Sequence, residues 1–235
     1  YGGESSSNVS GYRQYNLVNN YYKPGPATPS NHIWFVDPTT SCANYCIKTY
    51  GGTVVPGHFY FSGNKMYGNA SMTSDNWTGT TASASVIDQI KAAEPFSCNL
   101  MTLHSADDAF TAVLAHAGAS LRRDSIDERI ATETQNGTAT YKGSKSGISG
   151  LIDTQGDVGG WPAYSDNGET VTDSDSDGMP DWFEDACGLD KSKASDEAEK
   201  TLDTKGRYTN LEMYLHYLVR EITRDQNTSG TYTKL

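Results

Sequence analysis

Residues 12–22 read YRQYNLVNNYY, and this stretch indicates which kind of fold the chain adopts. It is rich in tyrosine, leucine and valine and lacks the period of an amphipathic helix, so it predicts β-structure. The asparagine pair in its middle, Asn19 and Asn20, is unusual for a β-sandwich. It suits a parallel solenoid, in which asparagines stacked at the bends bond to the coils above and below. We therefore expect short parallel strands joined by bends.

Two further stretches predict strands of the same kind: HIWFVDP at residues 32–38 and HFYFSGNKMYG at residues 58–68. Residues 21–30 read YYKPGPATPS, and their prolines lack the N–H that a central strand needs, so we expect an excursion between strands here. The composition agrees, because 23 glycines and 15 tyrosines favour a β-rich chain over a helix bundle. We assign residues 1–84 to the β-coils.

The next part of the chain changes to a helical pattern. Residues 105–108 form a capping box before an apolar periodic stretch that ends at Gly118, which predicts a helix. A second helix is expected over residues 124–134. Residues 138–169 are glycine-rich and aperiodic. We therefore expect residues 85–165 to combine helices with a segment that wraps over the β-coils.

An acidic stretch, DSDSDGMPDWFE at residues 173–184, has the spacing of a calcium-binding loop. Ligands are expected from loop positions 1, 3, 5, 7, 9 and 12, which are Asp173, Asp175, Asp177, Met179, Asp181 and Glu184. Met179 would use its backbone carbonyl, and Asp181 often acts through water. Gly178 at position 6 permits the sharp turn, and oxygen ligands suit calcium better than zinc. The alternative is a solvated acidic linker, but the spacing favours a structural calcium site.

The last part, residues 166–235, is predicted to end in a helix with a capping box at residues 209–212. Its apolar stripe consists of Leu211, Tyr214, Leu215, Leu218 and Ile222. A weaker candidate for a second metal loop begins at Thr201, with Asp203 at position 3 and Glu212 at position 12. Because Lys205 occupies position 5, where a ligand is needed, we interpret Glu212 mainly as a helix cap.

Charge and termini limit the possible partners. The net charge of -11 argues against nucleic acid and anionic membrane surfaces, and 13 of the 29 acidic residues lie between residues 166 and 203. No apolar run is long enough for a membrane span. The chain begins at Tyr1 without a signal-like segment, so we expect it to be processed or cut from something longer.

Cysteines and sequons suggest the compartment. Cys42 and Cys46 are close enough to bridge across a tight loop, and Cys98 and Cys187 could form a long-range bridge, although the sequence leaves the pairing open. Five Asn-x-Ser/Thr sequons are glycosylation candidates: Asn8, Asn69, Asn76, Asn136 and Asn227. With the calcium loop, these features lead us to expect a secreted protein, extracellular or at the cell surface.

Several stretches together resemble the secreted pectate lyases of polysaccharide lyase family 1, particularly Bacteroidetes-type members. In chain order they are NLVNNYYKPGPATP, FSGNKMYGN, SDNW, VLAHAGASLRRDSIDERI, IDTQGDVGGWP, DSDSDGMPDWFE and YTNLEMYLHYLV. The resemblance implies a mainly β chain, with the last coils of a right-handed parallel β-helix. A largely irregular C-terminal region with a few short helices and the calcium loop would follow. It also implies β-elimination of α-1,4-linked polygalacturonate, in which calcium bridges carboxylates and an arginine removes the C5 proton.

The catalytic motif of that family does not map onto this chain. The family's catalytic arginines and substrate-calcium aspartates lie on coils that precede Tyr1. Arg13 is the only arginine of the strand-rich part, and we interpret it as a coil residue. The histidines show no HxH or HExxH spacing. Residues 173–184 cannot supply the substrate calcium, because six or seven protein oxygens leave little room for a sugar carboxylate. We expect no catalytic residue here and no activity of this chain alone.

Three functions remain open. The chain is the C-terminal part of a pectate lyase-like enzyme, a non-catalytic structural or filament-forming subunit, or a carbohydrate-binding remnant. The remnant would stack sugars on Tyr21, Tyr22, Trp34, Trp77 and Trp161, for which core and coil packing is the favoured interpretation. A coil cut before Tyr1 exposes unpaired backbone groups. The expected partners are therefore a missing N-terminal β-helix chain or further copies of this chain, besides an acidic plant or algal polysaccharide.

Overall fold

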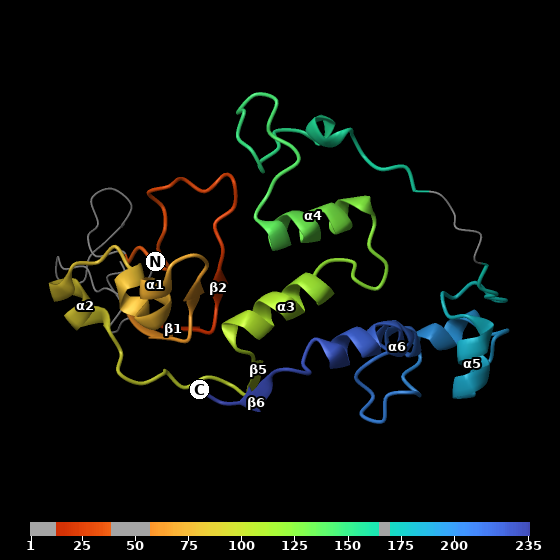
Figure 1. Ribbon diagram of the computed structural model, residues 1–235. Coiled ribbons are helices and arrows are strands. Elements are labelled where there is room, and N and C mark those ends of the chain that lie inside the picture. Colours follow the sequence, from red (N-terminus) through yellow and green to blue (C-terminus); the bar gives the residue numbers. More distant parts are fainter. Residues whose placement is uncertain (1–12, 39–56, 165–169) are drawn as a thin grey trace, which may run out of the picture.

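The structure, a computed structural model, describes residues 13–38, 57–164 and 170–235 (Figure 1). Its strands are β1 Gln14–Val18, β2 Tyr21–Tyr22, β3 His58–Ser62, β4 Lys65–Met66, β5 Met101–Leu103 and β6 Thr231–Thr233. The α-helices are α1 Ala70–Ser74, α2 Ala84–Ile90, α3 Ala106–His116, α4 Ser125–Asn136, α5 Asp181–Cys187 and α6 Asn210–Asp225. Three short 3-10 helices complete the set: η1 Asn76–Gly79, η2 Gln155–Val158 and η3 Ala194–Ala198.

The first four strands pair in parallel with one constant register. β1 pairs with β3 from Gln14 opposite His58, and β2 pairs with β4 from Tyr21 opposite Lys65. A parallel bridge joins Val36 to Thr80. Each of these pairs joins residues 44 positions apart, so two successive segments of the chain follow the same path, one stacked on the other. The expected parallel pairing of short strands is thus present.

Asparagines connect the two stacked segments at the bends. The backbone N–H and the side-chain amide of Asn20 both donate to Oδ1 of Asn64, at 3.0 and 2.9 Å. Asn64 is only 1% exposed; its own amide donates to the Leu17 carbonyl at 2.6 Å, and its backbone exchanges hydrogen bonds with Asn76. Both polar atoms of the buried Asn64 side chain therefore have partners, which is what burial requires. This contact is the one expected between asparagines of stacked bends.

The side chains of β1 and β3 contribute to a buried core that is rich in aromatic residues. Phe59 and Phe61 of β3 pack with Val36 and Ile90 in one buried cluster. Tyr15 stacks on Phe59 with ring centroids 4.9 Å apart. Three aromatic residues considered for sugar stacking are instead engaged with neighbouring rings: Trp77 with Phe61, Tyr21 with Phe110 and Tyr22 with Phe35. Packing is therefore the role of these three residues, and only Trp161 of the candidate set is highly exposed.

The segment after the stacked strands crosses them, held by asparagine side chains. The Asn16 amide donates to the Phe96 carbonyl at 2.7 Å and its oxygen accepts the Phe96 N–H at 2.9 Å. The Asn19 amide donates to the His104 carbonyl at 2.6 Å. Two residues later α3 begins, so these bonds place the first long helix against β2. β5, directly before His104, pairs antiparallel with β6, so the C-terminal strand lies beside the segment that Asn19 contacts.

The three predicted helices are confirmed. The Ser105 hydroxyl accepts the Asp108 N–H at the start of α3, and Asp124 caps α4, which ends at Gly137 in the left-handed conformation. Thr209 and Glu212 form the capping box of α6, so Glu212 is a helix cap, as expected. Helical caps of this kind satisfy N–H groups that lack partners in the first turn.

The balance of helix and strand differs from the expected mainly β chain. Within the described residues, helices cover more of the chain than strands. The strands contain only two to five residues each, whereas α3, α4 and α6 contain 11, 12 and 16 residues. Figure 1 shows the stacked strands at one end, α3 and α4 in the centre, and α5 and α6 at the other end. No helix in the described part is both long and apolar enough to cross a membrane.

Replacing Asn64 with alanine is expected to destabilise the stacked segments. The change removes the acceptor of Asn20 and the donor to Leu17 from a buried position. We expect a loss of about 3 kcal/mol in the free energy of unfolding, measured by urea denaturation, because unpaired buried groups retain their desolvation cost. The matched control is Asn99→Ala at an exposed position, expected to change stability by less than about 0.5 kcal/mol. Equal effects of the two substitutions would contradict a structural role for Asn64.

Candidate metal centre

The loop that precedes α5 folds around the side chain of Asp173. Oδ1 of Asp173 accepts the N–H of Ser176 at 2.7 Å, and Oδ2 accepts the N–H of Gly178 at 3.0 Å. Gly178 has a φ of 93°, a left-handed conformation that glycine adopts without strain. These features turn the chain sharply, so that successive aspartates face a common centre. The turn predicted at Gly178 is present.

Two groups of carboxylates result, and they share one residue. Asp173, Asp175 and Asp177 each offer an oxygen within 4.8 Å of the others. Asp177, Glu184 and Asp196 form a second group at the same spacing. The structure thus brings together four of the predicted ligands, Asp173, Asp175, Asp177 and Glu184, and adds Asp196.

Several carboxylate oxygens of this centre are buried without hydrogen-bond donors. The exposed fractions of Glu184, Asp196 and Asp177 are 0%, 3% and 7%. Six buried oxygens have no partner among the described residues: both of Asp175, both of Glu184, Oδ2 of Asp177 and Oδ1 of Asp196. Burying an anion without partners is unfavourable. A bound cation would stabilise these carboxylates by supplying the missing partner.

Burial and mutual repulsion also change the acidity of the centre. Burial, followed by repulsion from Asp177 and Asp175, raises the pKa of Glu184 to about 7. The pKa of Asp177 is raised as well, chiefly by burial. A divalent cation would reverse both effects, because it stabilises the charged form of each carboxylate.

Asp181 behaves differently from the other predicted ligands. Its two carboxylate oxygens accept the backbone N–H and the hydroxyl of Ser174, both at 2.8 Å, and these bonds lower its pKa. It belongs to neither carboxylate group. Met179 is fully buried, and its N–H donates to Oδ1 of Asp177 at 2.7 Å. Both residues therefore shape the loop in this structure.

Asp196 is the residue that the sequence analysis missed. It lies in η3, twelve residues after Glu184, and nothing in its local spacing suggests a metal loop. The concentration of acidic residues between 166 and 203 was the only sequence signal that included it. The path of the chain between α5 and η3 decides its position.

Aromatic packing and one buried asparagine attach this centre to α6. Phe183 lies 4.9 Å from Tyr214 between ring centroids, and Trp182 lies 5.6 Å from Tyr217. The predicted apolar stripe of α6 is only partly covered, because Leu215 is 52% exposed. Asn210, fully buried at the start of α6, donates from its amide to the Asp196 carbonyl at 2.9 Å.

In the weaker candidate for a second metal loop, Asp203 and Glu212 belong to no cluster of carboxylates with metal-ligand spacing. The side chain of Asp203 accepts the N–H groups of Lys205, Arg207 and Tyr208. Those bonds lower the pKa of Asp203. Among the described residues, the two carboxylate groups around Asp177 are the only clusters with metal-ligand spacing, and no histidine belongs to them.

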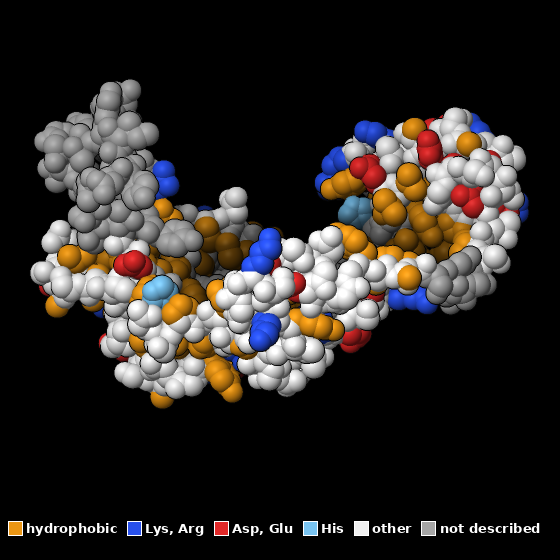
Figure 2. Space-filling view, turned by 90° about the horizontal axis from the view of Figure 1, so that it is seen from above, with side chains coloured by type: hydrophobic (Ala, Val, Ile, Leu, Met, Phe, Trp, Pro, Cys, Tyr) orange, Lys and Arg blue, Asp and Glu red, His pale blue; other side chains and the backbone are white. Residues whose placement is uncertain are grey.

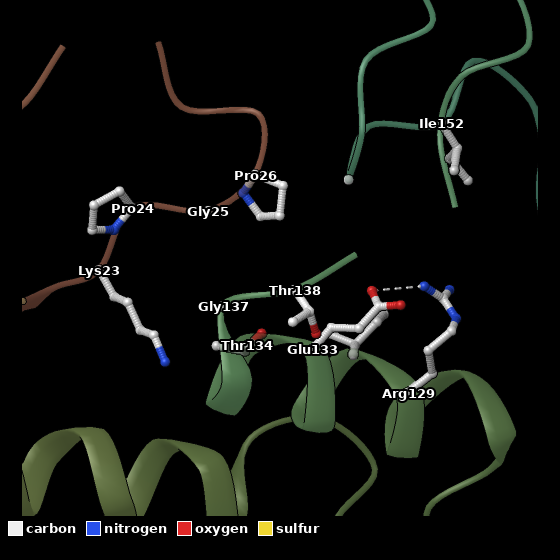
Figure 3. Close-up of a pocket in the computed structure, with 12 residues that line it drawn as sticks. Lys23, Pro24, Gly25, Pro26, Arg129, Glu133, Thr134, Gly137, Thr138 and Ile152 are labelled. Carbon is white, nitrogen blue, oxygen red and sulfur yellow. Dashed lines mark hydrogen bonds and ion pairs between the residues drawn. The ribbon is translucent and has the colours of Figure 1, made fainter. Parts of the chain in front are cut away.

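A separate cavity of about 470 Å³ lies between residues 23–26 and α4 (Figure 3). Its cationic side chains are already engaged. The Lys23 ammonium donates to the Gln135 carbonyl, and Arg129 pairs with Glu133 at 3.2 Å. Arg13, the arginine of the strand-rich part, immediately precedes β1, where its carbonyl accepts the His58 N–H at 2.8 Å.

The cysteine and sequon predictions have mixed outcomes. Cys98 and Cys187 are free thiols, so the proposed long-range bridge between them is not formed. Asn76 is 8% exposed, and its amide nitrogen donates to the Asn64 and Met72 carbonyls, so it is not accessible to a glycan. Asn136 and Asn227 are exposed and Asn69 is half-buried. The remaining predicted positions, Asn8, Cys42 and Cys46, lie outside the described residues.

Comparison with known proteins finds relatives of about half of the chain. No family model matches it. It is 40% identical over 115 residues to proteins named probable pectate lyase C from Aspergillus flavus and Aspergillus oryzae. It is 36% identical over 116 residues to the protein of that name from Emericella nidulans. These matches cover 49% of this chain and 24% of each relative, so the chain spans about a quarter of the length of the curated relatives it matches. The chain is therefore related to pectate lyase-like proteins; these relatives are fungal, and the Bacteroidetes type stays a prediction.

Proposed function

We propose that the chain is the C-terminal part of a secreted, calcium-binding pectate lyase-like protein. The observation that carries this proposal is the 40% identity over 115 residues to proteins named probable pectate lyase C. The stacked parallel segments agree with it, because two chain segments in constant register suit the last coils of a right-handed parallel β-helix. The helices and the calcium loop would then form the region that follows the coils.

The proposed chemistry assigns this chain a supporting role. β-Elimination of a uronate requires removal of a proton beside a carboxylate, which a metal ion assists by neutralising the developing charge. We infer that these catalytic groups lie on other coils of the whole protein, because the catalytic motif of the family maps onto no residue of this chain. The carboxylates around Asp177 would hold a calcium ion that orders the C-terminal region. Their six unpartnered oxygens are close to the full ligand number of calcium, which leaves little room for substrate.

A structural or filament-forming subunit is the second candidate, and one observation favours it. Figure 2 shows hydrophobic side chains gathered over the inner face of the lobe that contains α5 and α6. The exposed apolar residues of this lobe include Trp182, Tyr208, Leu215, Tyr217 and Val219. An apolar face of this kind is typical of a surface that packs against another part or another chain. A missing N-terminal β-helix chain and further copies of this chain are the partners we expect.

The polygalacturonate assay tests the main proposal. The whole protein that contains this chain is expected to produce unsaturated uronate ends from polygalacturonate in a calcium-dependent reaction, detected by ultraviolet absorbance. This chain alone is expected to produce none. Intact mass and electron microscopy of the native particle supply the second measurement. A particle built from copies of this chain alone, without lyase activity, would favour the structural candidate over the enzyme.

Removing calcium is expected to loosen the loop and η3. Without a cation, the carboxylates of Asp175, Asp177 and Glu184 repel one another in a buried place. Treatment with EDTA should lower the melting temperature and allow protease to cut between residues 170 and 205, and added calcium should restore both properties. The stacked segments at residues 58–66 serve as the internal control and should stay resistant. Unchanged melting and cleavage would rule out a structural calcium ion.

Calcium affinity is expected to depend on pH because calcium competes with a proton at Glu184. The pKa of this carboxyl is raised to about 7 in the metal-free protein, so the ligand is charged above pH 7 and increasingly neutral below it. Competition by one proton should weaken the apparent affinity about tenfold between pH 8 and pH 6, measured by calorimetric titration. Glu184→Gln should remove this dependence and weaken binding at pH 8. An affinity that is constant over this range would contradict the assignment of Glu184.

A further inference from the structure

Asp196 lies outside the twelve-residue loop, yet the fold brings it to the carboxylates of the loop. Its two oxygens have different environments. Oδ2 accepts the N–H of Asp190 at 3.1 Å, which fixes the side chain. Oδ1 is buried and has no donor, and Asp196 offers a ligand oxygen within 4.8 Å of those of Asp177 and Glu184. One oxygen therefore holds the residue in place, and the other is available to a cation.

The loop itself lacks one of its usual ligands. Position 9 is Asp181, whose oxygens accept from Ser174 at 2.8 Å and which belongs to neither carboxylate group, unlike the other acidic positions of the loop. Calcium takes six to eight oxygen ligands, so a loop without its ninth position needs an oxygen from elsewhere. Of the six buried oxygens without donors, Oδ1 of Asp196 is the one that comes from outside the loop and α5.

We propose that Asp196 is a direct ligand of the calcium ion, so that one ion joins the loop, the first turn of α5 and η3. This inference rests on the proposed calcium binding and extends it to a residue that the loop spacing does not include. Asp196 also accepts the Asn210 amide through its backbone carbonyl. The N–H of Asn210 donates to the Glu199 carbonyl at 2.7 Å. Calcium binding thus orders η3 and, through Asn210, the start of α6.

Calorimetric titration of the EDTA-treated protein with calcium chloride at pH 8 tests this assignment. Asp196→Asn keeps the size of the side chain and an acceptor for the Asp190 N–H, but removes the charge. The affinity should fall by about tenfold or more, because the number of charged ligands sets the affinity of such sites. The matched control is Glu197→Gln, which removes a charge from the next residue of η3, outside both carboxylate groups. The control should bind as the wild type does.

Hydrogen exchange of the wild-type protein gives a second test that needs no variant. Calcium should slow the exchange of amides in residues 190–199 as well as in residues 173–184. Slowing confined to residues 173–184, or wild-type affinity of Asp196→Asn, would overturn the role of Asp196 while leaving calcium binding intact. A wild-type protein that does not bind calcium would overturn this inference and the calcium proposal together.

Discussion

Repulsion among buried carboxylates is the constraint on which the C-terminal region depends. Asp175, Asp177, Glu184 and Asp196 together carry six buried oxygens that have no hydrogen-bond donor among the described residues. Bringing the carboxylates of Glu184 and Asp196 together without a counter-charge would be unfavourable, and the raised pKa of Glu184 reflects that cost. The same region is also held by the packing of Phe183 on Tyr214 and by the bond from the Asn210 amide to the Asp196 carbonyl. A divalent cation would make this arrangement more favourable, because its charge attracts all four carboxylates at once.

Buried polar groups need partners in the stacked strands as well. There, neutral hydrogen bonds supply them instead of a cation. Asn64 lies at a bend where its amide and backbone bond to Asn20, Leu17 and Asn76, so no charge is needed. Stacked and tilted rings, such as Tyr15 on Phe59, fill the space behind the strands. This part is therefore held together by neutral hydrogen bonds and apolar burial. We expect it to respond little to calcium or pH, in contrast to the loop at residues 173–184 and η3.

These two halves suggest how the chain could serve a pectate lyase-like protein. In the proposed arrangement, parallel coils carry the substrate and its catalytic groups, while the C-terminal region closes and protects the stack. β5 pairs with the C-terminal strand β6 beside the stacked segments, so the end of the chain returns to them. The calcium ion would stabilise the loop at residues 173–184 and η3, which precede α6 and β6 in the chain. Metal ions would thus have two roles in such a protein: one in the elimination reaction and one in stabilising the C-terminal region.

Local spacing in the sequence was sufficient to predict the helix caps at Ser105, Asp124 and Thr209 and the sharp turn at Gly178 in the acidic loop. Each of these features depends on residues within one or two turns of each other, so the sequence by itself determined them. The contact of Asn20 with Asn64 was expected in kind, but its partner lies 44 positions away and only the stacking register identifies it. The bridge between Cys98 and Cys187 was not formed, and Asp181 bonds to Ser174, because tertiary geometry places these groups elsewhere. Asp196 shows the same limit most clearly. Its sequence neighbourhood has no metal pattern, and only the tertiary path of the chain brings its oxygen near those of Asp177 and Glu184.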